Sequence, residues 1–446
     1  MKSQSKTTHV KIILILTFLL TLLYTPTIYS NTNISIVKKQ EYKTYPNNAV
    51  FEHNNTYTIG DYDKDNRLEA IITLTKDRET GLLFIVEDTK IEGKIIFKNF
   101  KPYRTFILND QIYVIGYFTK NKTFGIITLD KNLNIIDKVL FNKKYPESLS
   151  IKVVSETSIY GDEVLFTINI ASSNIFKPVY SDLIMYNVSN RSFKILYIID
   201  YLENDVKPVR IGDKIICGSV IIETRTGKIY EIIRGIRELP HRVHDQLLFD
   251  DKIYTLVSTP YATYFTVYDL LGERLDKMKI LSYDEVVKTS LIELNNNYYI
   301  YLQKYVSKKE QHVFIEYYKT IICDQNYTEK LAFSTSKKSG LGIGSKYAYI
   351  LHDNELYVFN GTYAEKLYIN LTNTENLDVK DIIVLKNNIG EETLIVLYHS
   401  GYTLLKLSYG FQLLSDTIWI LIGVSIIIPS ILYLIYKLLK RRSRHS

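Results

Sequence analysis

The sequence is poor in several residue types, and each shortage excludes a class of protein. Its 446 residues include only two cysteines, Cys217 and Cys323, which are too few for a disulfide framework. Nine prolines and 19 glycines exclude a collagen-like or proline-rich chain. Tyrosine, in contrast, is abundant, with 38 residues in a chain that is 46% hydrophobic. The composition therefore predicts a large buried core and favours β-strands over helices.

Helical patterning is also scarce in the middle of the chain. Between Ile34 and Gly410, no stretch of about ten residues has the apolar spacing of an amphipathic helix. This absence argues against a fold of alternating strands and helices.

The first 30 residues have the layout of a secretory signal peptide. Lys2, Lys6 and Lys11 precede an apolar run from Ile12 to Leu23, and polar residues follow it. We therefore predict a signal peptide over residues 1–30, with an uncleaved anchor as the alternative.

The other end of the chain predicts a transmembrane helix over residues 416–437. Ile418–Tyr436 is almost entirely apolar, and at about 1.5 Å per residue it is long enough to cross a bilayer. The basic tail that follows, 438–446, marks the cytoplasmic side. The prediction is a single-pass protein of the cell membrane, with residues 31–413 as its extracellular domain.

The formal charge of +7 comes from these two ends. The leader and the basic residues that follow Ile418–Tyr436 together include eight cationic residues and no acidic one. The middle of the chain is therefore close to neutral. The basic residues thus indicate topology, and no nucleic-acid partner is predicted. Eight Asn-x-Ser/Thr sequons between leader and span fit an exported glycoprotein: Asn33, Asn54, Asn121, Asn187, Asn190, Asn326, Asn360 and Asn370.

An internal repeat organises the middle of the chain. A strand-like segment preceded by a short turn recurs about every 46 residues, which is the range of propeller blades. The recurring segments are 68–72, 111–115, 163–166, 214–217, 252–256, 297–301, 346–350 and 393–396.

The repeat predicts an all-β chain, a β-propeller of about eight four-stranded blades. Seven blades, or two stacked sandwich domains, are the alternatives. We expect the unpaired segment Ile34–Tyr42 to join the last unit and close the ring, which removes exposed sheet edges. Cys217 and Cys323 then lie two blades apart, too far for a disulfide. The single tryptophan, Trp419, argues against blade types built on a repeated tryptophan.

One segment carries metal-binding chemistry. Gly60–Ile72 places carboxylates at alternate positions of a short loop, and Ca²⁺ prefers six to eight oxygen ligands, at about 2.3 to 2.6 Å. The spacing predicts a Ca²⁺ site, with a solvated acidic turn as the alternative. Its ligands are Asp61, Asp63, Asp65, the main-chain carbonyl of Arg67, and Glu69.

This loop resembles the FG-GAP/VCBS type of propeller repeat found in integrin heads, where an acidic loop joins the first two strands of a blade. The resemblance covers one blade and implies a structural Ca²⁺ held by Asp61, Asp63, Asp65 and Glu69. Two residues depart from the pattern: Asn66 stands in place of the usual glycine, and Glu69 in place of the usual aspartate. Asparagine tolerates the positive φ required at that position.

Two other segments look like sites. His241, Arg242 and His244 form a weak binding candidate at the start of an inner strand; residues three apart on a strand point to opposite faces, so a shared metal is not expected. Gly340–Lys346 lacks the spacing of a phosphate loop, and we interpret it as a strand and turn.

The sequence predicts location and architecture more sharply than activity. We expect a binding or scaffold protein that presents loops to a protein or glycan partner, among them the longer connections 171–182 and 304–311. The alternative is an extracellular enzyme acting on polysaccharide or peptide at the propeller channel. No catalytic residue is assigned, and an enzyme is the less favoured interpretation.

Overall fold

The computed structural model describes residues 32–52, 56–145, 149–172, 180–200, 206–231, 242–259, 262–282, 286–310, 313–352, 354–369, 371, 379–386 and 391–411. The chain divides into two compact units, and the larger one, Ile36–Leu407, contains the fold described below. The predicted signal peptide, transmembrane span and tail lie outside the described residues. Within the described residues no helix is long and apolar enough to cross a membrane, and the helix found there, η1 (Pro46–Asn48), has three residues.

The described chain is built almost entirely of antiparallel sheets whose strands follow one another in sequence. The first sheet has eight strands in two meanders, β2–β5 and β6–β9, joined by one parallel bridge between Thr80 and Phe100. Its strands are β2 (Tyr57–Gly60), β3 (Glu69–Thr75), β4 (Thr80–Glu87), β5 (Lys90–Lys98), β6 (Phe100–Leu108), β7 (Gln111–Phe118), β8 (Thr123–Leu129) and β9 (Ile135–Lys144).

The next three sheets repeat the same meander. One contains β10 (Leu149–Val154), β11 (Ser158–Tyr160), β12 (Glu163–Ser172), β13 (Tyr180–Asn187) and β14 (Ser192–Asp200). The second contains β15 (Val209–Ile211), β16 (Lys214–Cys217), β17 (Val220–Glu223) and β18 (Ile229–Glu231). The third contains β19 (Arg242–Phe249), β20 (Lys252–Ser258), β21 (Ala262–Asp269) and β22 (Arg274–Ser282).

Three four-stranded sheets complete the set. Two are regular meanders: β23 (Val286–Leu294), β24 (Asn297–Glu310), β25 (Val313–Cys323) and β26 (Glu329–Thr335), then β27 (Gly340–Ile343), β28 (Ala348–His352), β29 (Glu355–Phe359) and β30 (Ala364–Tyr368). The last sheet has the order β1-β33-β32-β31, with β31 (Asp381–Lys386), β32 (Glu392–Leu397), β33 (Tyr402–Phe411) and β1 (Thr32–Tyr42).

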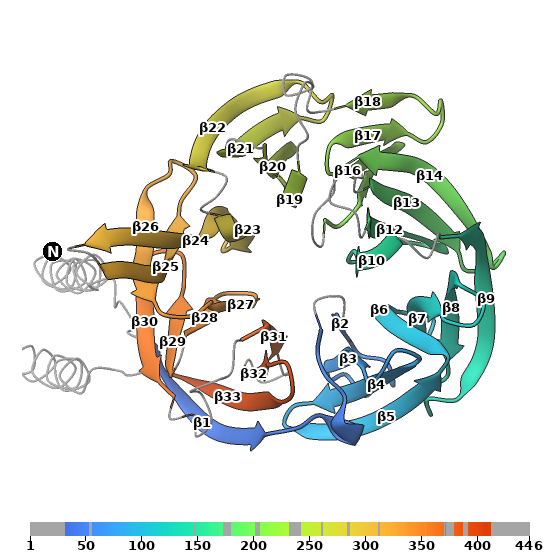
Figure 1. The fold of residues 1–446 in the computed structure, drawn as a ribbon, viewed down its shortest axis with the longest axis horizontal. Helices are drawn as coiled ribbons and strands as arrows, with labels where there is room; N and C mark the ends of the chain where they lie inside the picture. Colours follow the sequence, from blue (N-terminus) through green and yellow to red (C-terminus); the bar gives the residue numbers. More distant parts are fainter. Residues whose placement is uncertain are drawn as a thin grey trace, which may run out of the picture. The chain divides into compact units, whose positions relative to one another are not determined.

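Figure 1 shows these sheets one after another around a ring, with strands such as β10, β19, β23, β27 and β31 nearest the centre, so the larger unit is a β-propeller. Two stacked sandwiches are therefore excluded for this unit. All eight repeat segments overlap the second strand of a meander, namely β3, β7, β12, β16, β20, β24, β28 and β32.

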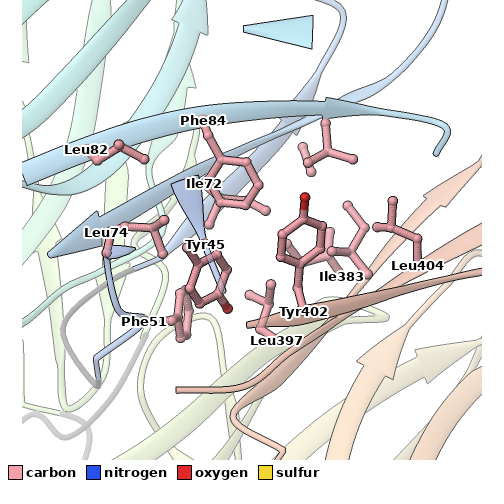
Figure 2. Packing of buried hydrophobic residues seen from close by; sticks show 14 of the residues in the cluster. Tyr45, Phe51, Ile72, Leu74, Leu82, Phe84, Ile383, Leu397, Tyr402 and Leu404 are labelled. Carbon is pink, nitrogen blue, oxygen red and sulfur yellow. The ribbon is translucent and has the colours of Figure 1, made fainter. Parts of the chain in front are cut away.

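The expected ring closure is confirmed: the first strand, β1, pairs with the last, β33. The packing beside it links the two ends of the ring, because one buried cluster combines side chains of β3 and β4 with those of β31, β32 and β33 (Figure 2). At its centre the rings of Tyr45 and Tyr402 stack with centroids 5.5 Å apart, and the Tyr45 hydroxyl donates to the Tyr398 carbonyl at 2.9 Å. Closure thus combines strand pairing with a shared apolar core.

Two local features differ from the sequence expectations. The segment 304–311, expected to be a loop, is mostly strand: β24 and β25 pair as far as Glu310 and Val313, beyond the residues that pair with β23 and β26. Cross-strand pairs such as Tyr305 with Tyr318, whose ring centroids are 5.6 Å apart, stabilise this two-stranded ribbon. Several innermost strands also contain a bulge near their start, which the sequence did not indicate: β6, β10, β19 and β23.

Candidate metal centre

The acidic loop, residues 61–69, joins β2 to β3. Its shape comes from two residues with positive φ, Lys64 at 66° and Asn66 at 68°. Asn66 thus adopts the positive φ that was expected at its position. The carboxylates close the loop on itself. Asp61 accepts the main-chain N–H groups of Lys64 at 2.7 Å and of Asn66 at 3.0 Å, and Asp65 accepts that of Arg67 at 2.9 Å.

Tyr62 anchors this loop to the core. Its side chain is 8% exposed and packs in the cluster that contains Ile71 and Leu83, whereas Asp61 and Asp63 on either side face outward to a greater degree. Its main-chain N–H donates to Glu69 at 3.0 Å, which joins the two ends of the loop. The alternation of inward tyrosine with outward aspartate holds the carboxylates in place.

The structure brings together the four predicted carboxylates. One oxygen each from Asp61, Asp63, Asp65 and Glu69 lies within 4.8 Å of the others, and this is the only such group found among the described residues. Two ligands on opposite sides of a Ca²⁺ ion are about 4.8 Å apart, so the four oxygens can share one ion. An all-oxygen, all-carboxylate donor set is the chemistry that a hard divalent cation prefers.

The electrostatics of Glu69 also fit a cation-binding role for this loop. Its side chain is 2% exposed, and burial raises the pKa of its carboxyl to about 7. The Tyr62 N–H opposes this rise, while Asp63, Asp61 and Asp65 add to it. A buried acid beside three other acids is costly to ionise unless a cation offsets the repulsion.

Glu87 lies beside the four carboxylates and was not predicted from the sequence. It lies directly opposite Glu69 in the β3–β4 register, and it accepts a hydrogen bond from the Arg67 guanidinium at 2.6 Å. The same guanidinium lies 3.7 Å from Asp65, so the Arg67 side chain offsets part of the negative charge while its carbonyl is the predicted ligand. Only the strand register, which no local motif indicates, places Glu87 here.

The equivalent turns of other meanders are different. Asn109–Asp110 and Asp250–Asp251 are two-residue connections in which both residues have positive φ, as in the turns preferred by hairpins. Asp110 pairs with Lys64 of the acidic loop at 2.7 Å.

The weaker binding candidate lies only partly within the described residues. His241 lies outside the described residues, and Arg242 begins β19. His244 lies at the β19 bulge, where its Nε2 and the Ser258 hydroxyl are 2.6 Å apart. Ser258 is 1% exposed and His244 is half-buried, so the Ser258 hydroxyl is not open to substrate.

Five of the eight sequon asparagines lie at turns between strands. Asn121, Asn190 and Asn326 are exposed, while Asn187 and Asn360 are half-buried and accept main-chain N–H groups within their own turns. Asn33 is in β1, and Asn54 and Asn370 lie outside the described residues.

The remaining sequence features are structural. Gly340–Ile343 is strand β27 and not a phosphate loop. A Cβ on Gly342 would meet Ile382 of β31 at 2.7 Å, so glycine here permits close packing of two inner strands. Cys217 and Cys323 are buried free thiols, as expected.

No family model and no curated protein matches the chain. Solved structures similar to it include the N-terminal domain of Nup159 (8% identity, TM-score 0.41, 86% of this chain and 97% of that one). Others are Drosophila Semaphorin 1a, extracellular domains 1–2 (8%, 0.44, 83% and 88%), and an oligogalacturonate lyase from Vibrio parahaemolyticus (8%, 0.41, 84% and 98%). At such low TM-scores this likeness carries no argument about function, and the fold assignment depends on the sheet topology described above.

Proposed function

We propose that the protein is a cell-surface binding or scaffold protein, in which an extracellular propeller tethered by the span 416–437 presents its turns to a protein or glycan partner. The observation that supports this most is the pairing of β1 with β33, because a ring closed by its own first and last strands is a rigid support for the loops between strands. Rigid loops lose less conformational freedom on binding than flexible ones.

We also propose eight blades, counting the two meanders β2–β5 and β6–β9 as separate blades. The single bridge between Thr80 and Phe100 supports this count, since strands within one blade pair along most of their length. The acidic loop of the first blade belongs, in this proposal, to the FG-GAP/VCBS type.

The acidic loop would hold a structural Ca²⁺ through Asp61, Asp63, Asp65, Glu69 and the Arg67 carbonyl. The convergence of the four carboxylate oxygens supports this proposal. The ion would supply the positive charge that lets Glu69 ionise, and the chain's own residues, Tyr62 above all, position the ligands.

Location is tested by protease treatment of intact cells that express the full chain with a C-terminal tag. We expect the bulk of the protein to be digested while the tag and a cytosolic marker survive, and both to be digested once the cells are permeabilised. Survival of the bulk in intact cells would contradict an extracellular domain. A loss of mass on enzymatic deglycosylation, reduced by one glycan in Asn190→Gln or Asn326→Gln, checks sequon use.

A further inference from the structure

A cluster of cations lies at the end of the first two meanders opposite the acidic loop. Strand β3 connects the two regions directly: the acidic loop ends where β3 begins, and the turn 76–79 follows its last residue, Thr75. The side chains in question, here called the basic patch, are Lys76, Arg78, Lys98, Lys101, Lys120 and Lys122.

Three connections that are distant in sequence build the basic patch. Lys76 and Arg78 come from the β3–β4 turn, and Lys98 and Lys101 flank the β5–β6 connection. The register places Thr80 opposite Lys98 and beside Phe100, which brings the first two connections together.

The third connection is the β7–β8 turn, which carries Lys120 and Lys122. The main-chain N–H of Thr119 in this turn donates to the Asn99 carbonyl of the β5–β6 connection at 3.0 Å, so the two connections are adjacent. The three connections therefore form one surface across two meanders.

Most of the positive charge on this surface is not neutralised by a carboxylate. All six side chains are exposed except that of Lys101, which is half-buried, and within the described residues no carboxylate forms an ion pair with Lys76, Arg78, Lys98, Lys101 or Lys120. Two acidic residues, Asp77 and Glu79, share the surface. The Asp77 carboxylate accepts the main-chain N–H groups of Glu79 at 2.8 Å and of Thr80 at 2.7 Å within its own turn.

From this arrangement we infer that the basic patch binds an acidic polysaccharide. The cations are spread over three turns and do not converge on one point, which suits a polymer with repeated negative charges better than a single small anion. The choice of a polysaccharide over other polyanions rests on the proposed extracellular location.

The test measures binding of the full-length protein, in non-ionic detergent, to immobilised polygalacturonate and to neutral dextran. Asn121 lies between Lys120 and Lys122, and a glycan there would cover the patch, so the protein is made in a host without N-glycosylation. Chelator is present throughout, because Ca²⁺ at the acidic loop could bridge to carboxylates of the polymer.

The variant is the double substitution Lys98→Glu and Lys120→Glu. Its matched control is Lys131→Glu with Lys346→Glu, two exposed lysines in turns at the opposite end of the strands, which changes the net charge equally. We expect the patch variant to weaken polygalacturonate binding about tenfold and the control less than about twofold, with wild-type binding weakened by salt.

Three results would overturn the inference: no binding of the wild type to polygalacturonate at low salt, an equal loss in the control variant, or tighter binding to duplex DNA than to the polysaccharide. Melting curves of both variants must match the wild type, which excludes misfolding as the cause. Because the purified protein is used, a failed patch test is distinct from a failed location test on cells.

Discussion

The acidic loop and the basic patch occupy opposite ends of the same strands, and they differ in how the sequence builds them. The acidic loop takes its four carboxylates from nine consecutive residues, whereas the basic patch takes its cations from three separate connections. Strand β3, with seven residues, separates them by about 20 Å, more than twice the screening length of about 8 Å at physiological salt. A local motif therefore brings its charges together in one loop, where we propose a cation site, while the proposed polysaccharide site is dispersed over a tertiary surface, and the two should act independently.

The largest expected effect is at the acidic loop. Ca²⁺ should stabilise the protein by about 2.7 kcal/mol when free ion is about a hundred times the dissociation constant, and chelation should remove this gain. Asp63→Asn with Asp65→Asn should abolish the Ca²⁺-dependent rise in melting temperature, which scanning calorimetry measures. The double substitution Lys98→Glu and Lys120→Glu should keep it, and an unchanged melting temperature on chelation of the wild type would remove the metal site.

The reverse experiment tests whether the acidic loop and the basic patch act independently. Asp63→Asn with Asp65→Asn should leave polygalacturonate binding, measured in chelator, within about twofold of the wild type, because charges separated by well over the screening length interact weakly. A larger change would show that the two ends communicate through the strands.

A pH dependence distinguishes the acidic loop further. Burial raises the pKa of Glu69 to about 7, above the value of about 4.5 for the unfolded chain. Protonated Glu69 therefore favours the metal-free fold at low pH, and this contribution to stability is lost as the pH rises through 7. In chelator, the melting temperature of the wild type relative to Glu69→Gln should therefore fall between pH values of about 5 and 8. A difference that stays constant over this range would contradict the raised pKa.

The smallest expected effect concerns Arg67. Its guanidinium contacts Glu87 at 2.6 Å but is 64% exposed, so solvent screens the pair. Arg67→Gln should lower the melting temperature in chelator by less than about one degree and should leave the Ca²⁺-dependent rise in place, because the proposed ligand is its carbonyl. Loss of that rise would instead assign the side chain a role in holding the loop.

Much of the fold could be predicted because its signals are local and repeated. The strand after each short turn recurs along the chain, and an unpaired segment such as Ile34–Tyr42 needs a partner edge, so blade positions and ring closure both follow. The hairpin over 304–311 could not be separated from a loop, because its polar residues satisfy either interpretation. The bulges of the innermost strands carry no sequence mark at all, because a bulge is a property of the pairing of two strands.

The sequence by itself determined the alternation of strands and turns and the ligand spacing of the acidic loop, because hydrogen bonds and φ preferences act over a few residues. Only the tertiary structure decided that Glu87 lies opposite Glu69 and that three turns form the basic patch. These pairings depend on strand register and on the order of sheets around the ring, where residues far apart in the chain become neighbours.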